Sequence, residues 1–97
     1  MIQNLNHGII TQALQNLEGW SINDTNNSIH KTFRFVDFKE AFSFMTKVAE
    51  LAETMNHHPE WFNIYNRLEV KLTTHEAGGI TKRDIKMARA MNEFEEV

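Results

Sequence analysis

Apolar and polar residues change their spacing several times along the chain, and each change predicts the boundary of an element. Four apolar residues near the start recur at i, i+3, i+4 and i+7, as on one face of an amphipathic helix: Ile10, Ala13, Leu14 and Leu17. Asn6 can cap the start of this helix, and Gly19 stands where a left-handed C-terminal cap belongs. The first element is therefore predicted to be a short helix.

Two strands are predicted to follow this helix. Trp20 and Ile22 begin the first strand, and the segment 24–28, rich in Asn, Asp and Ser, has the composition of a turn. Side chains then alternate between two faces over residues 29–36, which is typical of a half-buried antiparallel strand. One face of that strand carries Ile29, Lys31, Phe33 and Phe35.

The clearest helix is predicted over residues 38–55, behind a capping-box pattern formed by Asp37 and Glu40. Its apolar residues cover about half of the circumference, whereas a helix on a small sheet needs a stripe only slightly wider than about 100°. They are Phe38, Ala41, Phe42, Phe44, Met45, Val48, Ala49, Leu51, Ala52 and Met55. We therefore predict a homo-oligomer that covers the excess, with Phe44 and Leu51 in the contact. The alternative is that these two residues contact other helices of the same chain.

The long helix is predicted to end at His57-His58-Pro59, because the residue before a proline avoids helical backbone. Residues 62–72 then alternate with period two on both sides of Asn66-Arg67, where a tight turn can form. This pattern predicts two more strands.

A loop over residues 73–79 precedes the last helix, for which Thr81 and Asp84 form a capping-box-like start. The resulting order is helix, strand, strand, helix, strand, strand, helix. With hairpin connections, this order predicts a single α+β domain over residues 1–97: a four-stranded, mostly antiparallel sheet with helices packed on one face.

Composition narrows the class of protein. The chain has no cysteine, so neither a disulfide framework nor a thiolate metal site can form. A formal net charge of −3 argues against a nucleic-acid surface, and no window reaches the length of an apolar membrane span. No signal peptide is visible at the N-terminus. We therefore predict a cytoplasmic protein, with the nucleus as a second location in a eukaryotic cell.

The residues best suited to chemistry lie between positions 53 and 84. His57, His58 and His75 fall in this region, and imidazole groups suit proton transfer or metal binding. Glu53 lies on the last turn of the predicted long helix, where its carboxylate can accept a hydrogen bond from an imidazole. Asp84, in the first turn of the last helix, can project toward the same end of the sheet.

Each of these residues also has a purely structural explanation. A histidine at a helix end can interact with the helix dipole alone, and Asp84 can serve only as a member of the capping box. Trp61, Phe62 and Tyr65 can supply flat walls for an aromatic ligand, although the first two are more typical of a core. The other two histidines are predicted to be surface residues: His7 and His30.

Taken together, these positions form one pattern with fixed spacing: Glu53, His57-His58-Pro59, Tyr65, His75 and Asp84. This pattern resembles the signature of the pterin-4a-carbinolamine dehydratases. The resemblance extends over nearly the whole chain, from about residue 5 to residue 94, and includes these further stretches: Gly19-Trp20, 33–38, 58–63, 74–76 and 79–84.

The resemblance implies a reaction and a set of site residues. Members of that family remove water from 4a-hydroxytetrahydropterin, giving the quinonoid dihydropterin and so recycling the cofactor of aromatic amino-acid hydroxylases. By resemblance, His57, His58 and His75 are the acid/base set, without metal or cofactor. The implied supporting and substrate-binding residues are Glu53, Pro59, Trp61 and Asp84.

Two other classes of function stay open at the level of sequence. A metalloenzyme could use two of the histidines and one carboxylate as ligands. A protein-interaction or dimerisation cofactor would act through the helix over 38–55. The resemblance supports this second class, because some members of the family form tetramers and some are dimerisation cofactors of a homeodomain transcription factor.

Overall fold

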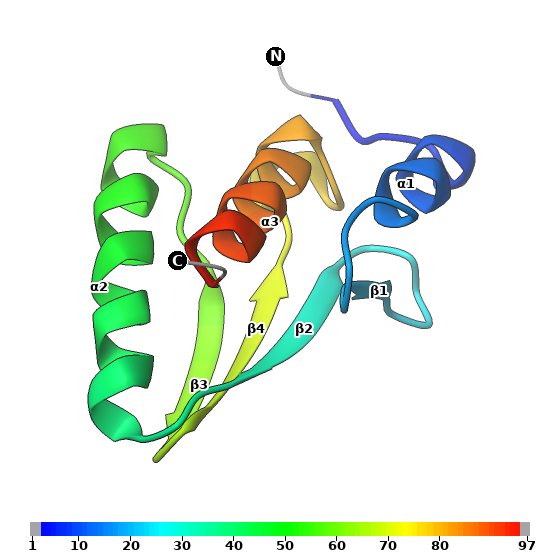
Figure 1. The fold of residues 1–97 in the computed structure, drawn as a ribbon. Coiled ribbons are helices and arrows are strands. Elements are labelled where there is room, and N and C mark those ends of the chain that lie inside the picture. The colour runs from blue at the N-terminus through cyan, green and yellow to red at the C-terminus, as the bar shows by residue number, and fades with distance from the viewer. Residues whose placement is uncertain (1–2, 96–97) are drawn as a thin grey trace.

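The computed structural model describes residues 3–95, in which three α-helices pack against a four-stranded sheet (Figure 1). The elements in chain order are α1 (His7–Leu14), β1 (Ser21–Ile22), β2 (Ile29–Arg34), α2 (Phe38–Met55), β3 (Glu60–Ile64), β4 (Arg67–Leu72), the 3-10 helix η1 (His75–Ala77) and α3 (Lys82–Glu95). The predicted order of helices and strands is confirmed, and η1 occupies part of the predicted loop. Over the same residues, no helix is long and apolar enough to cross a membrane.

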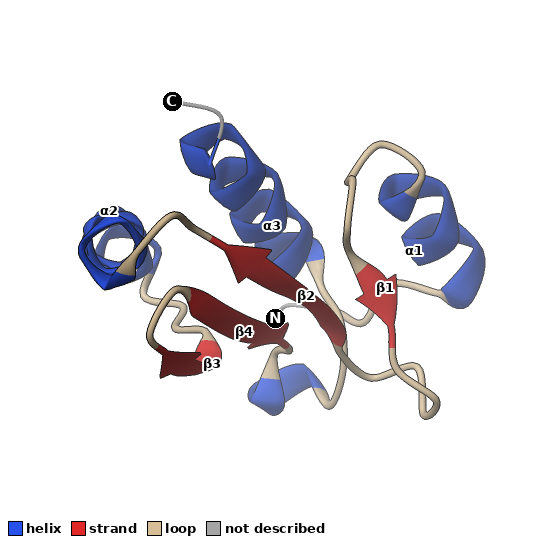
Figure 2. Ribbon diagram, turned by 60° about the horizontal axis from the view of Figure 1, so that its bottom comes forward, coloured by secondary structure: helices blue, strands red, loops and turns tan. Residues whose placement is uncertain are grey.

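The sheet has the strand order β1-β2-β4-β3, and each pair of neighbours is antiparallel. In the register of the two central strands, Phe33 lies opposite Leu68. The helices cover one face of this sheet, with α3 lying between α1 and α2 (Figures 1 and 2). The short strand β1 and the longer strand β3 are the two edges.

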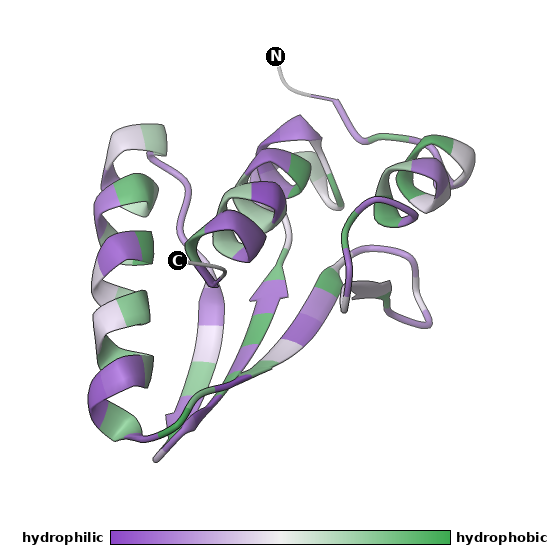
Figure 3. Cartoon of the chain, in the orientation of Figure 1, coloured by the Kyte–Doolittle hydropathy of each residue, from purple (hydrophilic) through white to green (hydrophobic). Residues whose placement is uncertain are grey.

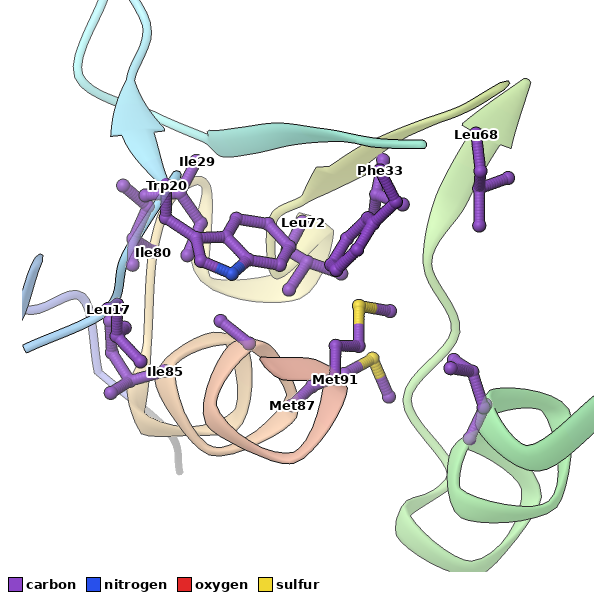
Figure 4. Packing of buried hydrophobic residues seen from close by; sticks show 14 of the residues in the cluster. Leu17, Trp20, Ile29, Phe33, Leu68, Leu72, Ile80, Ile85, Met87 and Met91 are labelled. Carbon is purple, nitrogen blue, oxygen red and sulfur yellow. The ribbon is translucent and has the colours of Figure 1, made fainter. Parts of the chain in front are cut away.

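Alternation along the central strands builds the core. Hydropathy alternates along β4 (Figure 3), and its inward residues Leu68, Val70 and Leu72 are almost fully buried. Met87 and Met91 extend from α3 toward the inner face of the sheet (Figure 4). Aromatic rings surround this centre: the Phe33 ring centroid lies 4.8 Å from that of Phe44 and 6.0 Å from that of Trp20.

Lys31 is an inward-facing residue with a charged end, and the structure satisfies that end at the edge of the core. Its Nζ donates to the carbonyl oxygen of Glu18 at 3.0 Å and to Asn92 Oδ1 at 2.8 Å. The same Nζ pairs with Glu95 Oε1 at 3.1 Å and lies 4.5 Å from the centroid of the Phe33 ring. These partners allow a lysine to occupy a position where the strand pattern places an apolar residue.

The structure confirms the predicted starts of the first two helices and the predicted extent of the second, but moves the end of the first. Asn6 Oδ1 accepts from the backbone N–H of residue 9, and Asp37 Oδ1 accepts from the N–H of Glu40. α1 ends at Leu14, so Gly19, although its φ is 86°, lies beyond the helix and is not its cap. α2 ends at Met55, where Asn56 forms a left-handed cap with φ 51°, before the histidines. Proline is therefore not what ends the long helix.

The predicted contact face of α2 is also corrected. Phe44 is only 4% exposed and belongs to the core of this chain, and Leu51 packs against that core. Phe44 is therefore not available for an intermolecular contact, because its ring packs against Phe33 and Phe35. Leu51 is only partly buried, so its place in an oligomer contact stays a prediction. The apolar residues of α2 that face outward are Phe38 and Phe42, whose ring centroids lie 5.7 Å apart.

On the edge strand β3, the alternating apolar residues Phe62 and Ile64 suggest a buried face, but they lie on the exposed one. Trp61 packs against the core, whereas Phe62 and Ile64 lie exposed on the face of the sheet without helices. The expectation that Phe62 belongs to the core is therefore wrong. Because β3 has a neighbour on one side only, this exposed pair lies beside an open sheet edge.

The burial pattern of β2 predicts a sharp difference between adjacent residues. Phe33→Ala should lower the free energy of unfolding by about 3–5 kcal/mol, because Phe33 is fully buried among aromatic neighbours. Thr32→Ala, on the solvent face of the same strand, should change it by no more than about 1 kcal/mol. Urea unfolding followed by circular dichroism measures both. Similar losses for the two variants would contradict the assigned faces of β2.

Candidate active site

The end of α2, the segment before η1 and the start of α3 meet around one buried carboxylate. His57 follows the left-handed cap of α2, and its backbone N–H donates to the carbonyl oxygen of Ala52 at 3.0 Å. This turn directs the imidazole toward α3, where His57 Nε2 lies 2.7 Å from Asp84 Oδ1. Asp84 is fully buried and His57 is 7% exposed.

Asp84 has the two roles that the sequence left as alternatives. Its Oδ2 accepts from the backbone N–H of Thr81 at 2.9 Å, which is the capping contact at the start of α3. The same Oδ2 accepts from the hydroxyl of Thr74 at 2.8 Å, while Oδ1 faces His57. Capping and histidine binding therefore use different oxygens of one side chain.

The buried contact determines which nitrogen of His57 is available. An ionised carboxylate only accepts hydrogen bonds, so as a carboxylate Asp84 takes its contact with His57 from an N–H on Nε2, in addition to its two other donors. Among the described residues, His57 Nδ1 has no hydrogen-bond partner. A fully buried nitrogen of this kind would be unsatisfied, but in this part of the chain the one fully buried side-chain nitrogen or oxygen without a hydrogen-bond partner is Arg67 Nε. His57 Nδ1 therefore keeps access to solvent.

The other two histidines lie outside this buried cluster, each beside its own carboxylate. His58 Nε2 is 2.6 Å from Glu53 Oε2, and both side chains are exposed. His75, at the first position of η1, has its Nε2 3.0 Å from Glu60 Oε2 and is 82% exposed. Adjacent histidines thus have different surroundings, as expected of an extended segment.

Three residues around the histidines were not singled out for chemistry by the sequence pattern. Glu60 binds His75, and no regular spacing relates the two residues because they lie on different elements. Thr74 and Thr81 donate to Asp84 through a hydroxyl and a backbone N–H, respectively. The capping box offered a signal for Thr81, whereas the contact of Thr74 depends on the shape of the loop.

The remaining residues of the sequence pattern lie at different distances from the histidines. Pro59 lies between His58 and Glu60, directly before β3. Trp61 borders a shallow hollow of about 390 Å³ on the open face of the sheet, which Glu60 also lines. Tyr65 follows the far end of β3, about 16 Å from its start at roughly 3.3 Å per residue. The structure therefore does not bring Tyr65 to the histidines.

A metal site of two histidines and one carboxylate does not form among residues 3–95. No three histidine, aspartate or glutamate side chains of this part of the chain gather around a common point. Each of the three imidazoles instead faces a different carboxylate: Asp84, Glu53 and Glu60.

Comparison with known proteins agrees with the fold and identifies the family. The sequence profile of the family described as "Pterin 4 alpha carbinolamine dehydratase" matches residues 3–94. A Rhizobium johnstonii protein is 51% identical over 90 residues, which is 93% of this chain and 89% of that protein. A Rhodopseudomonas palustris protein is 58% identical over 80 residues, or 82% of this chain and 79% of the relative. Both relatives carry the name "Putative pterin-4-alpha-carbinolamine dehydratase".

A solved structure gives the same result in three dimensions. The crystal structure of a transcriptional coactivator/pterin dehydratase from Brucella melitensis superimposes with a TM-score of 0.93 and is 46% identical in sequence. The match covers 96% of this chain and 99% of the other. The fold is thus that of an α+β pterin dehydratase. The chain belongs to the pterin-4a-carbinolamine dehydratase family.

Burial predicts that two carboxylates near the histidines differ in their importance for stability. Asp84→Ala should lower the free energy of unfolding by about 3 kcal/mol or more, because buried donors of His57, Thr74 and Thr81 lose their acceptor. Glu53→Ala should cost no more than about 1 kcal/mol, since its pair with His58 is exposed. Denaturant unfolding compares the two, and equal losses would be inconsistent with a buried cluster centred on Asp84.

Proposed function

We propose that this chain removes water from 4a-hydroxytetrahydropterins, giving quinonoid dihydropterins and recycling the pterin cofactor of aromatic amino-acid hydroxylases. The observation that carries the proposal is the buried pair of His57 and Asp84 beside two solvent-exposed imidazoles. Membership of the family supports the choice of substrate. The structure supports the choice of residues.

The reaction needs one proton acceptor and one proton donor. His57 suits the first role, because Asp84 holds the proton on Nε2 and leaves the lone pair of Nδ1 toward solvent. That nitrogen takes the proton of the pterin ring N–H as the new C=N bond forms. The C4a–O bond breaks, and the hydroxyl leaves as water with a proton from a second imidazole.

His58 and His75 are the candidates for the second role. Each is exposed, and its Nε2 is held by a carboxylate, Glu53 or Glu60, which orients the ring. Solvent then restores both protonation states, because one histidine has gained a proton and the other has lost one. No electron is transferred, so the elimination itself needs no redox cofactor.

The substrate also needs walls and support. We assign Pro59 and Trp61 to this role, because they connect His58 to the hollow on the open face of the sheet. Pro59 fixes the backbone between two site residues, His58 and Glu60. Trp61 packs against the core and so anchors the strand that carries Glu60 at the border of the hollow.

A second proposal concerns association. Phe38 and Phe42 form an exposed aromatic pair on α2, and we propose that a second copy of the chain covers them in a homo-oligomer. The same surface suits a protein partner, and the Brucella melitensis relative is described as a transcriptional coactivator as well as a dehydratase. A transcription-factor partner of this chain, and its cytoplasmic or nuclear location, stay predictions.

The proposed activity is tested in a hydroxylase-coupled assay that follows disappearance of the carbinolamine. The protein should accelerate this step with no added metal, after subtraction of the uncatalysed rate. His75→Ala should lower kcat by about 10²-fold, as for loss of a general acid or base, and should leave folding intact because His75 is exposed. His7→Ala, at an exposed position of α1 that does not line the hollow, is the matched control and should keep the wild-type rate.

His57 needs a different substitution. His57→Ala would lower stability as well as activity, because it would leave the buried oxygen Asp84 Oδ1 without a donor. His57→Gln keeps an N–H donor for Asp84 while removing the second ring nitrogen. Folded protein without acceleration over buffer would refute the proposed activity, and wild-type kcat in both His75→Ala and His57→Gln would refute these two residue roles.

Association through α2 is tested by two substitutions on that helix, one of an outward-facing phenylalanine and one of an inward-facing phenylalanine. Phe42→Glu places a charge in the proposed contact and should dissociate the oligomer without unfolding the chain. Phe44→Glu places the charge in the core and should unfold it. Sedimentation velocity and circular dichroism separate the two effects. A wild-type monomer at micromolar concentration would disprove the association.

A further inference from the structure

We propose that Thr74 is a positioning residue for the dehydration: through Asp84, its hydroxyl holds His57 in the tautomer that leaves Nδ1 free for the substrate. This inference rests on the proposed function for its catalytic meaning. The geometry behind it comes from the contacts of three buried side chains, Thr74, Asp84 and Thr81, which are each no more than 1% exposed.

The hydrogen bonds of the cluster have only one consistent direction. The hydroxyl of Thr74 donates to Asp84 Oδ2 at 2.8 Å, so its single proton is already used. In the 2.7 Å contact between the two threonine hydroxyls, Thr81 must therefore be the donor. Thr81 Oγ1 in turn accepts from the backbone N–H of Arg83 at 3.2 Å. The chain of bonds runs from the start of α3 through both hydroxyls and ends on Asp84.

This direction has a consequence for the carboxylate. Asp84 Oδ2 receives two donors, the Thr74 hydroxyl and the Thr81 N–H, so it has no room for a proton of its own. An ionised carboxylate carries no proton on its other oxygen either, so Oδ1 accepts from His57 Nε2 at 2.7 Å. The proton of a neutral His57 is accordingly held on Nε2, and Nδ1 carries the lone pair.

The backbone fixes Thr74 as firmly as its side chain does. Its N–H donates to the carbonyl oxygen of Gly79 at 2.9 Å, and its own carbonyl accepts from the N–H of Ala77 at 3.1 Å. Gly78 closes this loop with φ 71°, a conformation that favours glycine. The loop therefore presents the Thr74 hydroxyl to Asp84 and, at the next residue, presents His75 to solvent. One short segment thus positions one proposed catalytic histidine directly and a second through Asp84.

The test removes the hydroxyl and keeps the shape of the side chain. In Thr74→Val, Asp84 Oδ2 loses one of two donors and the carboxylate is free to turn or to take up a proton. The ring nitrogen resonances of His57 in a ¹⁵N-labelled sample report the tautomer without any substrate. We expect one tautomer, protonated at Nε2, in the wild type and a mixture in Thr74→Val.

Activity gives the second readout. Thr74→Val should lower kcat about 10-fold with little change in KM, in the range found when an outer partner of an oriented histidine is lost. Thr74→Ser keeps the hydroxyl and should restore both the tautomer and the rate. Thr73→Val is the matched control, because the Thr73 hydroxyl donates to the carbonyl oxygen of Asn27 and not to Asp84.

The outcomes separate this inference from the proposed function. A wild-type His57 protonated at Nδ1 overturns the inference without any variant, so it remains testable even if Thr74→Val fails to fold. An unchanged tautomer in folded Thr74→Val, or a loss in Thr74→Ser as large as in Thr74→Val, overturns it as well. If the tautomer depends on Thr74 but the wild type shows no dehydration, the proposed function fails and the catalytic meaning of Thr74 falls with it.

Discussion

One buried carboxylate connects the parts of this molecule that matter for its chemistry. Asp84 receives hydrogen bonds from the end of α2, from the loop before η1 and from the first turn of α3. A fully buried carboxylate is unfavourable unless donors surround it, so these three segments must stay together for the folded state to tolerate it. The same requirement holds His57 in place, so a constraint on stability also positions the proposed proton acceptor.

Around this fixed centre, the site combines a rigid part and an accessible part. His57 is almost completely buried and has one ring nitrogen bound to Asp84, whereas His58 and His75 are exposed beside Glu53 and Glu60. Such a difference in environment suits an elimination, which needs one group to accept a proton and another to donate one. Family membership makes pterin carbinolamines the natural substrates for this pair of roles.

Local sequence patterns predicted most of the fold because local physics determines it. Alternation along β2 and β4 and the capping residues Asn6 and Asp37 gave the order of elements and the antiparallel sheet. The errors arose where tertiary contacts decide. Phe44 and Phe42 look alike in sequence, and only the position of α3 and the sheet makes the first a core residue and the second a surface residue.

The site shows the same limit. Spacing brought His57, His58, His75 and Asp84 to attention, but it could not tell which carboxylate each imidazole binds. It also gave no sign of the Thr74 contact, because that contact depends on how the loop closes from residue 74 to residue 79. Partners that lie on separate elements are determined by the fold as a whole.

The five histidines provide the most direct test of the central claim that His57, His58 and His75 together form the pterin site. Their ring resonances can be followed by NMR while a stable dihydropterin without the 4a-hydroxyl is added to the wild-type protein. The resonances of these three histidines should shift with a common saturation curve, while that of His7, which lies on α1 and does not line the hollow, should stay in place. A shift confined to His7, or no shift at saturating pterin, would contradict the claim.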